Sequence, residues 1–260
     1  MNIQFNHDMM CHVKAIYKSK SQIARVVTEH WVANNAYCPS CGYHQLSGFK
    51  NNRPVADFYC SHCLEEFELK SKQESISKII TNGAFDTMIQ RIHQANNPNL
   101  FVLNYTADGL VDNFTVIPKH FFTSDIIIKR KPLSDNARRA GWVGCNIDIS
   151  QVPNVGKVAI IKNGIVNQPN LVINSFRQGF GLKDIALPHK GWLLDILLCI
   201  DKLNKSKFSL QELYAFENYL QIKHPNNANI QAKIRQQLQI LRNKGFINFL
   251  GNGYYQRIGD

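Results

Sequence analysis

RPVADFYCSHCLEEFELK, residues 53–70, reads as two short strands joined by a turn that carries two cysteines. Residues 55–59 and residues 66–70 alternate apolar and polar side chains, which is typical of a strand with one covered face. Cys60 and Cys63 lie between these segments, where the chain has to reverse. The stretch therefore predicts a β-hairpin with a pair of thiols at its turn.

Three charged side chains of this hairpin are predicted to converge. Period two places Asp57 on the same face of the first strand as Val55 and Tyr59. Pairing with the second strand, on which Glu68 and Lys70 share a face, can then bring the three together. Two carboxylates can hold Mg²⁺ against a phosphate, and a lysine can orient or help deprotonate the attacking water. The pattern favours metal-assisted phosphodiester hydrolysis, although a charged surface hairpin would give the same letters.

Four cysteines have the spacing of a zinc site. The two Cys-x2-Cys pairs are Cys38 with Cys41 and Cys60 with Cys63, and eighteen residues separate them. This spacing is typical of a tetrahedral zinc site. Because four thiolates leave no position open for a substrate water, we expect a structural zinc ion that rigidifies the hairpin.

The charge of the chain favours a polyanionic partner. Its 260 residues include 30 Lys and Arg against 19 Asp and Glu, a formal net charge of +11. Such a balance favours nucleic acid over an acidic small molecule, although basic proteins without a polyanionic partner also occur. The hydrophobic fraction of 44% and the charged fraction of 19% are those of a folded globular protein.

We find no pattern of a secretion signal or a membrane span. The first ten residues, MNIQFNHDMM, lack a basic region followed by an apolar run. The most apolar stretch, residues 192–203, contains Asp195 and Asp201, and it is too short and too charged for a spanning helix. The sequence thus predicts a cytoplasmic protein.

The hairpin belongs to a predicted nuclease-like domain of mixed α/β class over residues 1–186. Core strands are predicted at residues 100–105, 113–117 and 157–161. An amphipathic helix over residues 21–32 precedes the hairpin. Glu29 on this helix is either an exposed glutamate or a further carboxylate of the metal site.

A basic loop over residues 130–144 is a candidate DNA contact. Arg138 and Arg139 suit phosphate or guanine contacts. Trp142, among these arginines, suits stacking on a base, and packing in the core is the alternative for this side chain.

From residue 187 to residue 260 the sequence predicts a small winged helix-turn-helix domain. Helices are predicted at residues 191–203, from residue 209, and at residues 230–243, with two short strands at residues 245–250 and 253–257. Ser209 and Glu212 have the spacing of a capping box. Three helices followed by a β-hairpin are the order of a winged helix.

The last of these helices is predicted to read DNA. Its apolar stripe leaves five polar side chains largely elsewhere, namely Lys233, Arg235, Gln236, Gln237 and Arg242, of which the first four are the candidate DNA contacts. Such side chains can contact base edges in the major groove. Winged helices also bind proteins, so the fold alone does not establish a DNA contact.

Together these features resemble a known family. The D-x10-E-L-K pattern that begins at Asp57 resembles the PD-(D/E)xK nuclease motif, with Ala56 where the motif has proline. Over essentially its full length the chain resembles the DpnI family of methyl-directed type II restriction endonucleases. Residues 51–60 and residues 65–72 carry the closest match.

The resemblance implies a function and a set of roles. It implies Mg²⁺-dependent hydrolysis of double-stranded DNA at GATC sites that carry N6-methyladenine. By position, Asp57, Glu68 and Lys70 would be the catalytic set, with the two carboxylates holding Mg²⁺ and the four cysteines holding Zn²⁺. Trp142 would line a pocket for the methylated adenine, and the winged helix would be a second reader of methylated DNA.

Two other functions stay open at this point. A non-enzymatic DNA-binding regulator, built from a zinc ribbon and a winged helix, would carry the charged hairpin as plain surface. A nuclease of altered specificity would keep the three charged residues and cut another site. Because the sequence shows no dimerisation element, we expect a monomer.

Overall fold

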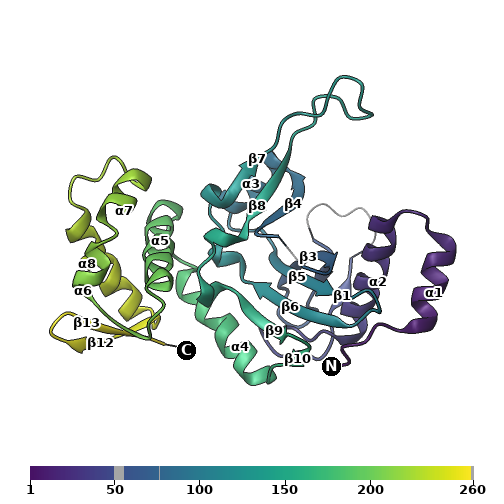
Figure 1. Ribbon diagram of the computed structural model, residues 1–260, viewed down its shortest axis with the longest axis horizontal. Helices are drawn as coiled ribbons and strands as arrows, with labels where there is room; N and C mark the ends of the chain where they lie inside the picture. The colour runs from purple at the N-terminus through teal and green to yellow at the C-terminus, as the bar shows by residue number, and fades with distance from the viewer. Residues whose placement is uncertain (50–55, 76, 259–260) are drawn as a thin grey trace.

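A computed structural model describes residues 1–49, 56–75 and 77–258 (Figure 1). The helices are α1 (His7–Ile16), α2 (Lys20–Asn35), α3 (Phe85–His93), α4 (Pro169–Gln178), α5 (Leu187–Leu203), α6 (Leu210–Tyr214), α7 (Glu217–Lys223) and α8 (Ile230–Asn243). The strands are β1 (Ser47–Gly48), β2 (Phe58–Tyr59), β3 (Glu66–Gln73), β4 (Ile79–Ala84), β5 (Asn99–Tyr105), β6 (Val111–Ile117), β7 (Ile127–Lys129), β8 (Gly144–Asp148), β9 (Val158–Lys162), β10 (Ile165–Val166), β11 (Lys207–Ser209), β12 (Ile247–Gly251) and β13 (Tyr254–Arg257).

A seven-stranded sheet forms the centre of the larger part of the molecule. Its order is β1-β2-β3-β5-β6-β9-β10, in which β3 and β5 are parallel and the other neighbours are antiparallel. β5 lies in the middle and is buried along nearly its whole length, as its apolar sequence NLFVLNY favours. The structure confirms the predicted mixed α/β core.

The two faces of this sheet are covered differently. One face packs against side chains of α1, α2 and α4, in a core that contains Trp31, Phe101 and Phe176. The other face packs against α3 and a second, three-stranded sheet of order β4-β8-β7, and Leu100 and Val102 belong to this core. The second sheet was not predicted from the sequence.

The C-terminal part has the order of a winged helix, as predicted. The capping box of Ser209 and Glu212 is present, and α8 spans the predicted residues 230–243. The segment predicted as one helix from residue 209 is divided into α6 and α7, and β11 joins the predicted hairpin in a sheet of order β11-β13-β12.

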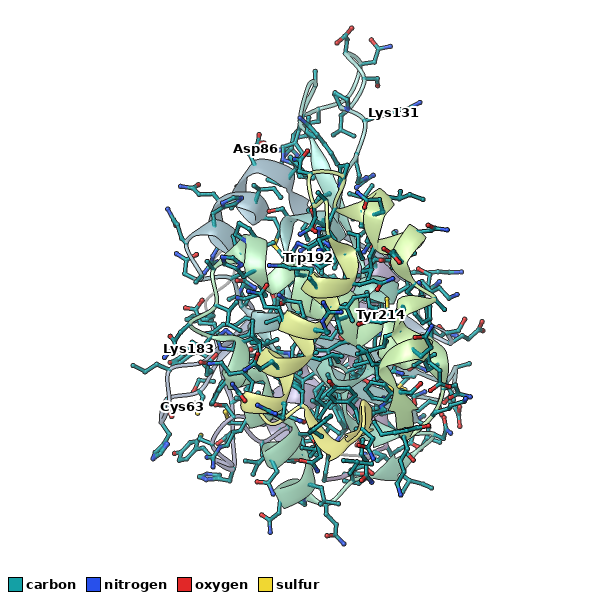
Figure 2. All side chains as sticks on the ribbon, turned by 90° about the vertical axis from the view of Figure 1, so that its left-hand side faces the viewer. Cys63, Asp86, Lys131, Lys183, Trp192 and Tyr214 are labelled. Carbon is teal, nitrogen blue, oxygen red and sulfur yellow. The ribbon has the colours of Figure 1, made fainter. Side chains whose placement is uncertain are left out.

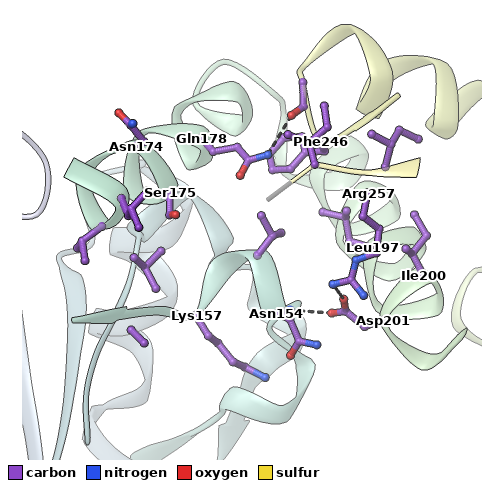
Figure 3. A pocket seen from close by; sticks show the side chains of 18 of the residues that line it. Asn154, Lys157, Asn174, Ser175, Gln178, Leu197, Ile200, Asp201, Phe246 and Arg257 are labelled. Atoms are coloured by element: carbon purple, nitrogen blue, oxygen red, sulfur yellow. Dashed lines mark hydrogen bonds and ion pairs between the residues drawn. The ribbon is translucent and has the colours of Figure 1, made fainter. Parts of the chain in front are cut away.

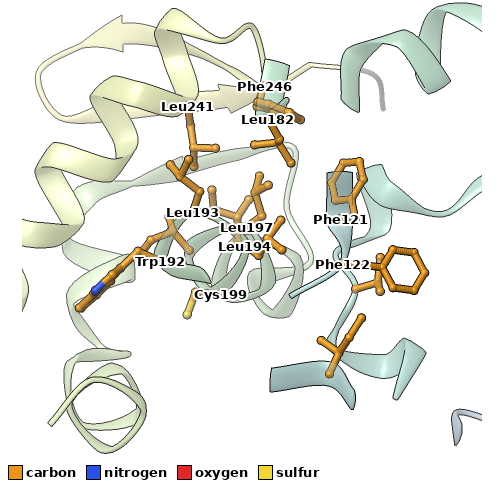
Figure 4. Close-up of a cluster of buried hydrophobic side chains, with 14 of the residues drawn as sticks. Phe121, Phe122, Leu182, Trp192, Leu193, Leu194, Leu197, Cys199, Leu241 and Phe246 are labelled. Carbon is orange, nitrogen blue, oxygen red and sulfur yellow. The ribbon is translucent and has the colours of Figure 1, made fainter. Parts of the chain in front are cut away.

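The two parts share one apolar core (Figure 4). Phe121 and Phe122 from the larger part belong to the same cluster as Leu197 of α5 and Phe246 beside β12. The division at residue 186 stays a prediction. None of the helices in the described part of the chain is long and apolar enough to cross a membrane.

Candidate active site

The hairpin of β2 and β3 brings Asp57 to the side of Glu68. Phe58 pairs with Phe67 in the antiparallel register, so Asp57 stands one step further, opposite Glu68. Its backbone N–H donates to the Phe67 carbonyl oxygen at 2.9 Å, and its carboxylate oxygen Oδ2 accepts from the backbone N–H of Leu69 at 2.7 Å. These two bonds fix the Asp57 carboxylate against β3.

The structure shortens the predicted first strand. β2 begins at Phe58, and Asp57 lies in a bend immediately before it. Val55, which was predicted to share a face with Asp57, lies outside the described residues. The carboxylate of Asp57 is therefore positioned by its own hydrogen bond to β3 and not by the alternation of a regular strand.

Glu68 is the buried member of the site. Its side chain is on the sheet face that carries Leu100, and only 7% of the residue is exposed. Its Oε1 lies 2.8 Å from the Lys70 ammonium, and its Oε2 accepts from Asn82 Nδ2 at 3.3 Å. Burial raises the pKa of Glu68, Lys70 lowers it, and the charge of Asp57 raises it further. Two carboxylates thus lie close enough to repel one another.

Glu29 approaches the same place from α2. The helix is fixed to β3 by a hydrogen bond of 2.9 Å between the hydroxyls of Thr28 and Ser71. Burial raises the pKa of Glu29, Arg25 lowers it, and Asp57 raises it. Glu29 is half-buried and within electrostatic reach of Asp57, so it is not the exposed glutamate of the first alternative.

The other two carboxylates of the hairpin have structural partners. Glu65 lies 3.0 Å from the Lys119 ammonium and accepts from the Asn99 amide at 2.8 Å. Glu66 lies 3.3 Å from the guanidinium of Arg91. The ion pairs of Glu65 and Glu66 tie β3 to its surroundings, and they leave Asp57 and Glu68 as the clustered pair.

The side chains at this point fit a divalent cation. Asp57 and Glu68 offer hard oxygen ligands, which Mg²⁺ prefers in proteins. Burial and then the charge of Asp57 raise the pKa of Glu68, and a cation held between the two carboxylates would remove their repulsion. Asp57 and Glu68 are therefore the residues that could hold Mg²⁺, and Glu29 lies within electrostatic reach of Asp57.

The four cysteines converge as predicted. All four Sγ atoms lie within 4.8 Å of one another, with 3.6 Å between Cys38 and Cys63 and 3.6 Å between Cys41 and Cys60. With Zn–S bonds of about 2.3 Å, the edges of a tetrahedral site are about 3.8 Å. Burial raises the pKa of Cys38 and raises that of Cys63 to about 11, so a bound cation would be needed to hold these two groups as thiolates. The cluster has the geometry to hold zinc.

The basic loop joins β7 to β8 and extends away from the rest of the molecule (Figure 1); Lys131 is labelled near its base in Figure 2. Arg138 and Arg139 are exposed. Trp142 is half-buried, and its ring packs so closely on Gly144 that a Cβ there would lie 2.8 Å from it. Trp142 is not among the described side chains that form or line the two cores.

The predicted open face of α8 is correct in part. Arg235 and Gln236 are exposed, Lys233 is half-buried over the Trp192 ring, and Arg235 donates to the Tyr214 hydroxyl at 2.6 Å. Gln237 was placed wrongly, because only 1% of it is exposed. It follows Ile230 by seven residues, nearly two helical turns, so it lies in the apolar stripe.

Two family models match the chain. Residues 1–185 match the model described as DpnI, the Dam-replacing family. The chain belongs to the Dam-replacing family. Residues 188–257 match the model described as the Dam-replacing HTH domain. These matches confirm the resemblance drawn from the sequence, and they make the chain a restriction endonuclease family member with a DNA-binding helix-turn-helix domain.

In this Dam-replacing chain, sequence reasoning missed one residue of the site. Asn82 lies on β4, in the second sheet, and its amide contacts Glu68. No motif in the sequence singles out Asn82, because its place beside Glu68 depends on a sheet that was itself not predicted.

Proposed function

We propose that this protein is a methyl-directed type II restriction endonuclease. It hydrolyses double-stranded DNA at GATC sites that carry N6-methyladenine, and it requires Mg²⁺. The observation that carries this proposal is the buried Glu68 beside Asp57 and Lys70 on one hairpin. Membership of the Dam-replacing family supports it.

Each residue of the cluster has a role in this proposal. Bound Mg²⁺ would supply positive charge at the scissile phosphate. Asp57 and Glu68 would hold that ion, and Glu29, within electrostatic reach of Asp57, is the candidate for a third carboxylate. Lys70, held at 2.8 Å from Glu68, orients the attacking water and offsets charge that develops on the phosphate oxygens.

The four-cysteine cluster has a structural role in this proposal. Cys60 and Cys63 flank the turn of the hairpin, and Cys38 and Cys41 come from the segment after α2. A zinc ion bound by four thiolates has no open position for a substrate. It acts by fixing the hairpin that presents the catalytic residues.

Two parts of the molecule would read the DNA. Arg138 and Arg139 contact the backbone or guanine, and Trp142 lines a pocket for the methylated adenine. The winged helix is a second methylated-DNA reader through Lys233, Arg235 and Gln236. One methyl group is worth about 1–3 kcal/mol, so two readers multiply a discrimination that one provides only weakly. We infer a monomer with a nuclease domain over residues 1–186 and a winged-helix domain over residues 187–260.

Digestion of one plasmid in two forms tests the proposal. The forms are adenine-methylated at GATC and unmethylated, each incubated with Mg²⁺ or with EDTA, using the wild type and Asp57→Ala. We expect fragments only when the DNA is methylated, Mg²⁺ is present and the protein is the wild type. Binding of both forms without cutting would favour the DNA-binding regulator, and cutting of both forms would contradict the methyl requirement.

A further inference from the structure

Asn82 is an amide buried at the candidate site. Only 7% of the residue is exposed, and its Nδ2 lies 3.3 Å from Glu68 Oε2. Its other polar atom, Oδ1, accepts from the backbone N–H of Gly83 at 2.7 Å. Because Oδ1 is committed to that N–H, Nδ2 is the atom directed at the carboxylate.

A β-bulge in β4 sets the direction of the Asn82 side chain. Asn82 pairs with Cys145 and Ala84 pairs with Gly144, so Gly83 is an extra residue in the ladder between β4 and β8. Such β-bulges bend a strand and redirect a side chain, often next to active sites. The bulge places the backbone N–H of Gly83 where it can hold the Asn82 amide.

Asn82 and Lys70 contact the two carboxylate oxygens of Glu68 from different sheets. Lys70 engages Oε1 from β3, and Asn82 engages Oε2 from β4. The two donors together fix the plane of the carboxylate. An amide brings no charge, so Asn82 orients Glu68 without neutralising it, and the charge stays available to a metal ion.

We propose that Asn82 is a positioning residue that orients Glu68 for Mg²⁺ binding; this inference rests on the proposed function. The same amide joins the catalytic hairpin to the sheet that carries the loop of Trp142. Asn82 pairs with Cys145 on β8. The residue before Cys145 is Gly144, on which the Trp142 ring packs. Asn82 therefore connects the metal-binding carboxylate to the second sheet.

A Mg²⁺ titration of cleavage tests the assignment. For Asn82→Ala we expect the Mg²⁺ concentration at half-maximal rate on methylated plasmid to rise about 10- to 100-fold, as when residues that orient metal ligands are removed. The rate at saturating Mg²⁺ should return toward the wild-type rate, and binding of methylated DNA in EDTA should be unchanged. Thr81→Ala, an exposed change one residue away on β4, is the matched control and should titrate like the wild type.

Isothermal titration of Mg²⁺ into the full-length protein without DNA gives a second readout. It should show the same 10- to 100-fold weaker binding for Asn82→Ala. Circular dichroism checks the fold of the variant, and Asn82→Ser replaces it if the alanine variant does not fold.

The outcomes separate the two claims. If the wild type cuts without Mg²⁺, or Glu68→Ala cuts like the wild type, the proposed function itself is wrong. If both of these behave as expected, while Asn82→Ala matches the wild type in its Mg²⁺ requirement and affinity, only the role of Asn82 is wrong.

Discussion

Glu68 lies in a place where burial raises its pKa and so favours its neutral form. The Lys70 ammonium at 2.8 Å and the Asn82 amide offset that effect, while Asp57 works against them. The other acids of the hairpin, Glu65 and Glu66, sit in ion pairs with Lys119 and Arg91. At the scale of residues, the site is defined by the two carboxylates whose partners lie within the site, Glu68 with Lys70 and Asn82, and Asp57 with the backbone of β3.

His120 gives a prediction at the same scale. Burial, Lys119 and Lys190 lower its pKa from 6.5 to about 4. Because the folded-state pKa lies below the unfolded value, the unfolded chain binds more protons between about pH 6.5 and pH 4. Stability is therefore fully present above about pH 6.5, and about 3 kcal/mol of it is lost as the pH falls through 4.

Chemical denaturation between pH 7.5 and pH 4 measures this effect. We expect His120→Gln to make the free energy of unfolding depend less steeply on pH in the acid range. The change in slope should correspond to at most one bound proton. His30→Gln, at an exposed position of α2, is the matched control. An unchanged slope for His120→Gln would contradict the assignment.

The sequence predicted which residues lie together where their spacing along the chain decides which side chains meet. Asp57, Glu68 and Lys70 meet because two short strands pair around a turn. Asn82 could not be found, because it reaches Glu68 through a bulge in another sheet. Gln237 could have been placed correctly, since a spacing of seven from Ile230 already puts it on the buried stripe.

At the scale of elements, the hairpin of β2 and β3 depends on the cysteine cluster. β2 has two residues and pairs with β1, which also has two. Such short strands bury little surface of their own and are marginal without further support. The cluster of four thiols supplies that support at the turn.

Cys60→Ser tests the role of this cluster. We expect the variant to lose its zinc, measured by metal analysis, and to lose cleavage of methylated DNA below detection, because the catalytic residues are no longer held together. Cys11→Ser, at an exposed thiol outside the cluster, should keep both. Full cleavage by a zinc-free Cys60→Ser would show that the cluster is dispensable.

Elements were predicted where their sequence pattern is strong and local. α8 and the capping box at Ser209 follow from apolar spacing and from cap chemistry. β4, β7 and β8 were missed, because they are short strands whose pairing brings together residues 16 to 69 positions apart. Such pairing is set by the tertiary fold and leaves little local signal.

At the scale of the whole molecule, Asp201 links the two parts. It lies on α5, and its carboxylate accepts from the Asn154 backbone N–H at 2.6 Å and lies 2.9 Å from the Arg257 guanidinium (Figure 3). These contacts stand at a cleft of about 800 Å³ between the parts. Together with the core of Figure 4, they fix the winged helix relative to the sheet.

Asp201→Ala should therefore weaken the whole fold. Removing a largely buried acid with two partners is expected to lower the free energy of unfolding by about 2–3 kcal/mol. Chemical denaturation measures this change, with Asp184→Ala, at an exposed acid of the same region, as the control. Equal stability of the two variants would show that Asp201 does not hold the parts together.

The claim that the hairpin carries the chemistry is tested most directly by the cleavage rate of Lys70→Ala on DNA methylated at GATC. Lys72→Ala is the matched control, since this exposed lysine lies two residues further along the same strand. We predict that Lys70→Ala lowers the rate at least about 10²-fold, with DNA binding retained, while Lys72→Ala cuts at nearly the wild-type rate. Equal rates for the two variants would contradict the account.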